Sequence, residues 1–297
     1  MNFNVFVALT VNGLAMGVIY ALLAMGLILL IRAVGVMNFA QGDLLMLGAY
    51  ITCWLTVDLE LPFWLMVLVA LLCFAVVGLI FMFSVYWPLR NASYPAATVI
   101  ATMGASMVLK ELVTLLWGSL PRSMPSLVRT EDGSAAVLQI GSINLQWQYV
   151  LTILVGIVIM ALVFFLFEKM YVGKMMQAAA QDAYAASMLG IPTIATIAVT
   201  YIVVVIMVSV GGYMIAPIFM VSTTLGSLQL RAFAGVVIGG FGNIKGAIIG
   251  SLLVGLIESF STLQFSSYKD VTVFMVLIIF LLVRPQGIFG ERIADKA

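Results

Sequence analysis

Histidine is absent from this sequence of 297 residues, and its absence removes the side chain that most often binds metals and transfers protons near neutral pH. A zinc site and a Ser-His-Asp hydrolase are therefore excluded. Cysteine is scarce, and Cys53 and Cys73 lie within apolar runs, too far apart for a CxxC motif. We interpret both as buried packing thiols.

A phosphate-binding loop is also missing. The pattern GxxxxGK[ST] does not occur, and Gly-Lys is found only at Gly173–Lys174. The chain therefore cannot hydrolyse ATP by the usual P-loop route. We predict that it is not an enzyme and that it holds no catalytic residue, metal or cofactor of its own.

Charged residues are also few. Charged residues make up 8% of the chain and hydrophobic residues 64%, whereas a soluble domain carries about 25% charged residues. The mean hydropathy is +1.22. A net charge of +1 gives no indication of a nucleic-acid partner. No base precedes Arg32, so the first apolar run lacks the basic region of a secretory signal and is expected to be a retained span.

Long apolar runs are abundant, and each of about 20 residues is a candidate membrane span. We predict an all-α polytopic membrane protein with eight or nine membrane segments in a single domain over residues 1–297. Two glycine-rich segments near the C-terminus are expected to be short or re-entrant. The predicted segments are 8–30, 38–56, 62–84, 96–117, 148–168, 193–215, 228–241, 244–260 and 270–284.

Lysine and arginine in short loops predict the orientation. The loop with Asp58 and Glu60 carries no base, which leaves the N-terminus outside. The 118–147 loop is then external. The segments expected inside are 31–37, 85–95, 169–192 and the tail from Arg284, with Arg292 and Lys296.

The cytoplasmic stretch from Lys174 to Pro192, KMMQAAAQDAYAASMLGIP, is rich in alanine and glutamine, unlike the runs around it. These are good helix formers, and Gly190 followed by Pro192 is a helix stop. We expect a helix over 176–190 with a small-residue face that packs closely on another protein. An interfacial linker is the plainer alternative. The small face would hold Ala179, Ala183 and Ala186, and the adjoining side Gln181, Tyr184 and Met188.

Polar residues enter the predicted membrane region in two places. Asn38, Gln41 and Asp43 open the second segment, where they either cap a helix or face a translocation path. The fourth segment carries a polar residue at every fourth position, which keeps them on one face. This stripe is either a water-lined wall or a hydrogen-bonding contact between helices. Its members are Thr98, Thr102, Ser106, Lys110 and Thr114.

Glycine repeats at a spacing of four near the C-terminus and in the first segment. This spacing lets helices pack backbone to backbone, and a gate or pore lining is the alternative. The glycines concerned are Gly13, Gly17, Gly235, Gly239, Gly242, Gly246 and Gly250.

Several of these stretches, in this order, resemble the branched-chain amino-acid ABC permeases of the LivH type. They are GVMNFAQGDLLMLGAY, YWPLRNASYPAATVIATMG, GVVIGGFGNIKGAIIGSLLVGLIES and VRPQGIFGER. The resemblance covers essentially the whole chain. One departure is Gln41, where many members of that family have histidine.

The resemblance implies an ABC importer permease fold in the bacterial inner membrane, working by alternating access. It implies a second permease subunit, such as a LivM-type paralogue or another copy of this chain, two cytoplasmic ATP-binding subunits that hold ATP and magnesium, and a periplasmic substrate-binding protein. The substrates would be leucine, isoleucine and valine; relatives carry other amino acids, urea, short amides or aromatic acids.

The resemblance also assigns roles to residues. The loop corresponding to 174–192 is the coupling helix, which docks on an ATPase subunit. We expect the coupling residues to be Ala179, Gln181, Asp182, Ala183, Tyr184, Ala186, Met188 and Gly190. We expect the substrate pathway to be lined by Asn38, Gln41, Thr98, Thr102 and Ser106.

Two other classes remain open from the residues alone. A stand-alone secondary transporter or channel would use Asp43, Lys110 and Glu258 as ion or proton sites, but it gives no reason for the alanine-rich helix. A structural membrane scaffold is the third class. Dependence of transport on ATP hydrolysis or on an ion gradient separates the first two.

Overall fold

The structure is a computed structural model that describes residues 3–90, 94–130, 134–140, 143–263 and 269–289. Part of the predicted external loop and the tail residues Arg292 and Lys296 lie outside the described residues. The chain divides into two compact units. The first comprises residues 1–28, 126–156 and 228–297, and the second comprises 29–125 and 157–227, so that the division falls within two long helices.

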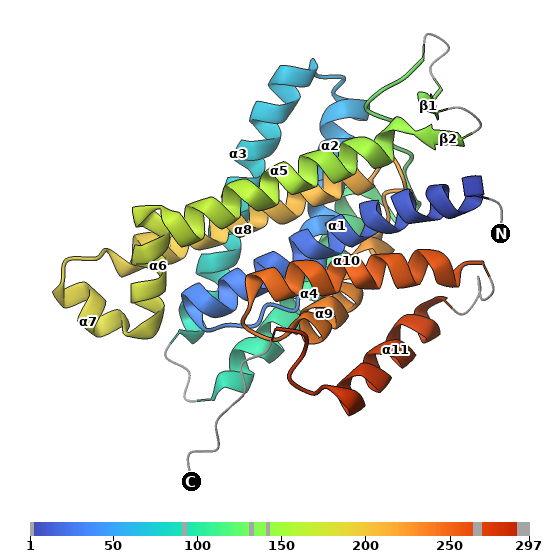
Figure 1. Ribbon diagram of the computed structural model, residues 1–297. Helices are drawn as coiled ribbons and strands as arrows, with labels where there is room; N and C mark the ends of the chain where they lie inside the picture. The colour runs from blue at the N-terminus through green and yellow to red at the C-terminus, as the bar shows by residue number, and fades with distance from the viewer. Residues whose placement is uncertain (1–2, 91–93, 131–133, 141–142, 264–268, 290–297) are drawn as a thin grey trace. The chain divides into compact units, whose positions relative to one another are not determined.

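The described residues are mostly helical (Figure 1). The elements are α1 (Phe3–Val34), α2 (Gln41–Cys53), η1 (Trp54–Asp58), α3 (Phe63–Phe81), η2 (Met82–Tyr86), η3 (Trp87–Leu89), α4 (Pro95–Trp117), β1 (Val137–Ile140), β2 (Ile143–Gln146), α5 (Trp147–Lys169), α6 (Tyr171–Gln181), α7 (Ala183–Met188), α8 (Thr193–Ile215), η4 (Thr223–Ser227), α9 (Leu228–Gly239), α10 (Ile244–Ser261) and α11 (Lys269–Val283).

Six helices in the described part of the chain are long and apolar enough to cross a membrane. The prediction of a helical, multi-pass membrane protein is confirmed at this level. α2, α9 and α11 are shorter, with 13, 12 and 15 residues. The six long helices span Phe3–Val34, Phe63–Leu89, Ala96–Trp117, Trp147–Lys169, Thr193–Ile215 and Ile244–Ser261.

Two features depart from uniform α-helix. α2 and α3 each end in a π-helical turn, η1 and η2. The predicted external loop contains a two-stranded antiparallel hairpin, in which Val137 lies opposite Gln146 and Ile140 opposite Ile143. The 118–147 segment is therefore partly β-structure, which the all-α prediction did not include.

Glycines bring the helices of the first unit into backbone contact. α9 and α10 form a helical hairpin, with α11 beside it (Figure 1). A Cβ at Gly239 would lie 1.9 Å from the carbonyl oxygen of Gly246, and one at Gly250 would lie 2.1 Å from that of Gly235. On α1, Gly13 and Gly17 lie against Gly255 and Leu252 of α10.

Gly242 has a different role from the other glycines of the predicted set. It has no atom within 4 Å of an added Cβ and a φ of +86°, so it forms the α9–α10 turn rather than a helix contact. Asn243 follows it and caps α10, its Oδ1 accepting hydrogen bonds from the backbone N–H groups of Lys245 and Gly246.

Small residues also set the packing in the second unit, where α2 and α3 contact α8. A Cβ at Gly212 would lie 2.1 Å from the carbonyl oxygen of Leu45, and one at Gly48 would lie 2.5 Å from the Cα of Ser209. Ser209 Oγ donates to the carbonyl oxygen of Leu44 at 3.3 Å. This α2–α8 contact fixes the start of α2 in position against α8.

We expect Gly239→Ala to lower the free energy of unfolding by about 1–3 kcal/mol, because the new methyl group meets backbone that cannot rotate away. Gly104→Ala is the matched control on α4, since an added Cβ there meets nothing within 4 Å. Thermal unfolding of the purified protein in detergent measures both. Equal midpoints for the two variants would contradict the packing assigned to Gly239.

Candidate functional site

The start of α2 carries three buried polar side chains. Asn38 and Gln41 are 0% exposed and Asp43 is 2% exposed. Asn38 Oδ1 accepts a hydrogen bond from the backbone N–H of Ala40 at 2.9 Å, just before the helix begins. Asp43 lies in the first turn, where the helix dipole favours a negative charge.

The polar stripe of α4 faces into the second unit, where α4 packs against α2. Thr102 is 2% exposed, and its hydroxyl accepts from the backbone N–H of Phe39 at 3.2 Å and donates to the carbonyl of Val99 at 2.8 Å. Thr98, Ser106 and Lys110 on the same face are half-buried. The opposite face is apolar and exposed, with Met107 at 69% and Leu115 at 85%.

Asp43 and Lys110 face each other across the α2–α4 contact. Asp43 Oδ1 lies 3.6 Å from Lys110 Nζ, and Ser106 is a second hydrogen-bonding neighbour of the Asp43 carboxylate. The short helix η4 packs against the Asp43 carboxylate at Gly226, where a Cβ would lie 2.2 Å from Asp43 Oδ1. We call Asn38, Gln41, Asp43, Thr102, Ser106 and Lys110 the polar cluster.

The structure brings four of the five predicted pathway residues into this cluster: Asn38, Gln41, Thr102 and Ser106. Thr98 lies one helical turn before Thr102 on the same face. Lys110 shares the α4 stripe with them, and Asp43 shares the start of α2. From the sequence, Asp43 was a possible cap or path-facing residue and Lys110 a member of the polar stripe, but neither was among the five predicted pathway residues.

The cytoplasmic stretch forms two helices instead of the one expected over 176–190. α6 ends at Gln181, and Asp182 has extended backbone angles of φ −153° and ψ 104°. Asp182 Oδ1 then accepts from the backbone N–H of Ala185 at 2.9 Å and caps α7. A local side-chain cap thus outweighs the helix propensity of the flanking alanines. Gly190 has a φ of +81°, consistent with the expected stop.

The exposed surface of α7 differs from the predicted small-residue face. Ala179 and Ala186 are 7% and 3% exposed and face inward, while Ala183 is exposed. The large side chains point outward: Tyr184 is 74% exposed, Met188 73% and Leu189 83%. We call Tyr184, Met188 and Leu189 the α7 surface. Leu189 escaped the sequence analysis because it follows the last position of the expected pattern.

α6 is held against the end of α5 by backbone contact. A Cβ at Gly173 would lie 2.2 Å from the carbonyl oxygen of Phe167, and Gln177 Nε2 donates to that same oxygen at 2.8 Å. The role of Gly173 could not be predicted from the sequence, because a single glycine has no spacing pattern.

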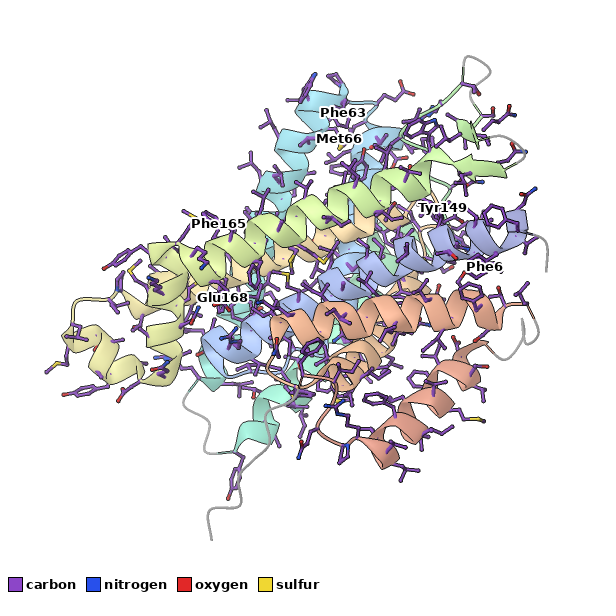
Figure 2. The ribbon with its side chains drawn as sticks, in the orientation of Figure 1. Phe6, Phe63, Met66, Tyr149, Phe165 and Glu168 are labelled. Atoms are coloured by element: carbon purple, nitrogen blue, oxygen red, sulfur yellow. The ribbon has the colours of Figure 1, made fainter. Side chains whose placement is uncertain are left out.

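The side chain of Arg32 links the end of α1 to this end of α5. Arg32 Nη1 donates to Glu168 Oε1 at 2.7 Å, and its guanidinium lies 5.6 Å from the centre of the Phe167 ring. Figure 2 shows Glu168 near the end of α5, about one turn after Phe165. We call Arg32, Glu168, Phe167, Gly173 and Gln177 the α5–α6 corner.

The predicted external loop is tied to η1 by an ion pair. Arg122 Nη2 lies 2.5 Å from Asp58 Oδ1, and this hydrogen bond raises the pKa of the Arg122 guanidinium. Backbone hydrogen bonds also pair Arg122 with Val221. Within residues 126–156, Gln148 Oε1 accepts from the backbone N–H of Leu127 at 3.2 Å.

Across the described residues, no group of three or more cysteine, aspartate or glutamate side chains is placed to hold a metal ion. Hydroxyl, amide and paired charged groups dominate the polar cluster. Such a set can form hydrogen bonds and ion pairs with a polar solute.

Comparison with known proteins gives one consistent family. The sequence model of the family "Branched-chain amino acid transport system / permease component" matches residues 9–283. The high-affinity branched-chain amino acid transport system permease protein LivH of Escherichia coli is 31% identical over 314 residues, covering 99% of both chains. The corresponding permease protein BraD of Pseudomonas aeruginosa is 30% identical over 300 residues, covering 96% of both.

Among solved structures, PsaBC from Streptococcus pneumoniae in complex with Fab has a TM-score of 0.48 at 15% identity, covering 96% of this chain and 91% of that chain.

Proposed function

The chain belongs to the family of branched-chain amino acid transport system permease components, and on this premise we propose that it moves branched-chain or related amino acids across the bacterial inner membrane. It is a multi-pass permease subunit of an ATP-binding-cassette transporter and not an enzyme. Its relatives LivH and BraD are named as branched-chain amino acid permeases, which supports this substrate class.

The proposed assembly has this chain beside a second permease subunit, a LivM-type paralogue or a second copy. Two cytoplasmic ATPase subunits hold ATP and magnesium, and a periplasmic binding protein delivers the solute. α2, α9 and α11 join the six long helices as membrane segments, which gives nine. The loop 174–192 is cytoplasmic, and the 118–147 loop is external.

The α7 surface is the observation that carries the proposal. A polytopic chain without a P-loop needs a contact through which a separate ATPase can act. Tyr184, Met188 and Leu189 are large, apolar and 73–83% exposed, on a short helix that the α5–α6 corner positions. Aromatic and methionine side chains of this kind are enriched at the centres of protein interfaces. We assign the docking contact to these three residues rather than to the small-residue face expected from the sequence.

In the proposed cycle, ATP binding closes the two ATPase subunits and moves α6 and α7. The α5–α6 corner transmits that movement to α5 and to the end of α1. The polar cluster then lines part of the solute pathway, because its amide and hydroxyl groups can replace the water around a polar solute.

We expect Tyr184→Ala to reduce co-purification of the ATPase with the tagged chain by at least about tenfold, as for a hot-spot residue worth about 2 kcal/mol. Tyr171→Ala is the matched control, because Tyr171 is 75% exposed but lies at the start of α6. The measurement is a pull-down from the native membrane in mild detergent, with mass spectrometry.

An ATPase that is retained by Tyr171→Ala and lost by Tyr184→Ala supports the importer and the docking contact. Equal retention by both variants would contradict the contact assigned to α7. If the wild-type chain purifies alone and moves solute under an ion gradient, the importer proposal itself is overturned.

A further inference from the structure

We propose that Asp43 and Lys110 bind the two charged ends of the transported solute, an α-amino acid zwitterion. The Asp43 carboxylate would take the α-ammonium, and the Lys110 ammonium would take the α-carboxylate. The inference rests on the proposed function and deepens it, because it names which chemistry of the solute is recognised and by which residues.

The separation of the two charges is the first observation. Asp43 Oδ1 and Lys110 Nζ are 3.6 Å apart, which is beyond the 2.7–3.2 Å of a hydrogen bond with a nitrogen donor. It is the longest ion pair in the described part of the chain; Arg32–Glu168, for comparison, measures 2.7 Å. The two groups attract each other without closing on each other, so each can accept another charged partner.

The surroundings of Asp43 are the second observation. Its side chain is 3% exposed, and Oδ1 has no hydrogen-bond partner among the described residues. A buried carboxylate oxygen without a hydrogen bond is costly. Residue 226 is glycine, and this allows the backbone of η4 to approach Oδ1 closely, since a Cβ there would lie only 2.2 Å from this oxygen. An ammonium has the charge and the hydrogen-bond donors that this oxygen lacks.

Lys110 supplies the complementary half of the site. Its side chain is 43% exposed, which gives access from outside the cluster. A lysine is a mobile point charge on a four-carbon stem. It can therefore move from Asp43 towards an incoming carboxylate when an ammonium replaces it at Asp43.

Charge balance then selects the class of solute. Asp43 and Lys110 are together neutral, and an added zwitterion leaves the site neutral. A simple carboxylate would leave the Asp43 charge without a partner at 3% exposure, which is unfavourable. A simple amine would pair with Asp43 only, whereas a zwitterion pairs with both residues. Ser106 and Thr102, on the same face of α4, add hydroxyl groups next to the charges.

The alternative is an ion pair that only holds α2 and α4 together. The two roles differ in a double variant. Removing both charges by Asp43→Asn with Lys110→Met leaves no unpaired charge, so it should preserve a merely structural contact. The same double variant removes both recognition groups of a binding site.

The test uses the full complex with its partner subunits in proteoliposomes, with uptake of radiolabelled leucine and ATP hydrolysis stimulated by the binding protein as readouts. We expect Asp43→Asn, Lys110→Met and the double variant each to lower uptake at least about tenfold. A tenfold loss of uptake corresponds to one lost charged contact of about 1.4 kcal/mol. ATP hydrolysis should stay within about twofold of wild type, because these residues are expected to contact the solute and not the ATPase. Glu111→Gln, next to Lys110 but on the exposed face, is the matched control and should leave uptake unchanged.

Uptake by the double variant within about threefold of wild type overturns the inference and leaves a structural ion pair. If Asp43→Asn does not assemble, the half-exposed Lys110→Met variant decides alone: wild-type uptake overturns the inference, and loss of uptake with retained ATP hydrolysis supports it. Failure of the wild-type complex to move amino acids on ATP would instead overturn the proposed function, so the two failures are distinguishable.

Discussion

Replacing Arg231 with methionine is expected to lower the free energy of unfolding by about 3–5 kcal/mol, the cost of leaving a buried charge without its partner. Arg231 lies in α9 and contacts acids from two other helices of the first unit. Its Nε is 3.4 Å from Glu258 Oε1 in α10, and its Nη2 is 2.5 Å from Asp270 Oδ1 in α11.

Because the ion pair between Arg231 and Glu258 is largely buried, this network is sensitive to the loss of one of its charges. The side chains of Arg231 and Glu258 are 13% and 8% exposed, whereas that of Asp270 is 57% exposed. Tyr20 of α1 is 0% exposed, and its hydroxyl donates to Glu258 Oε2. Without Arg231, the Glu258 carboxylate would lose its ion pair with the guanidinium while remaining buried. Asp270 can instead be hydrated.

Three further variants test this account in detergent by thermal unfolding. Asp270→Asn should have a small effect of about 0–1 kcal/mol, because an exposed ion pair contributes little. Tyr20→Phe should cost about 1.5–3 kcal/mol, the value of a hydrogen bond to a charged group. The double variant Arg231→Met with Glu258→Gln should recover part of the loss. A wild-type midpoint for the single Arg231→Met variant would refute the network.

The sequence predicted the helices well because the apolar runs are long and separated by charged or glycine-rich turns. The predicted segment 96–117 and α4, Pro95–Trp117, agree within one residue. The network around Arg231 could not be predicted, because its residues are far apart in the chain and meet only when four helices pack. The π-helical ends of α2 and α3 likewise leave no mark in the hydropathy pattern.

The candidate site was predicted only in part, because the spacing of residues shows which side chains share a helix face but not what that face contacts. Four-residue spacing places Thr102, Ser106 and Lys110 on one face, but it does not say which face turns inward. In the structure the polar face of α4 is the buried one, with apolar side chains outside, as expected where lipid replaces water. At α7 the inference failed at Asp182, since a capping side chain decides whether an alanine-rich stretch is one helix or two.

Gly173→Val is expected to reduce amino-acid uptake about a hundredfold while leaving most of the fold intact. The valine Cβ would lie 2.2 Å from the carbonyl oxygen of Phe167 and 2.4 Å from that of Leu166. Both are backbone atoms, so the overlap can be relieved only by moving α6 away from α5. That movement also breaks the hydrogen bond from Gln177 to Phe167.

The magnitude follows from the population of the docked α6. Overpacking against backbone costs about 3 kcal/mol, which corresponds to about a hundredfold shift towards an undocked arrangement. In the proposed cycle, α6 transmits the movement of the ATPase to α5, so an undocked α6 should leave ATP hydrolysis running while uptake fails. Uptake per ATP hydrolysed is therefore the quantity to measure, in the reconstituted complex.

Gly190→Ala is the control for Gly173→Val, because it changes the same loop without displacing α6 from α5. Gly190 has a φ of +81° and nothing within 4 Å of an added Cβ, so alanine brings only backbone strain, about 1 kcal/mol. We expect it to lower uptake less than tenfold. If Gly173→Val lowers uptake and ATP hydrolysis in equal proportion, the variant impairs assembly. If both stay at wild-type level, α6 does not carry the movement, and the ATPase must act on the spanning helices through another contact.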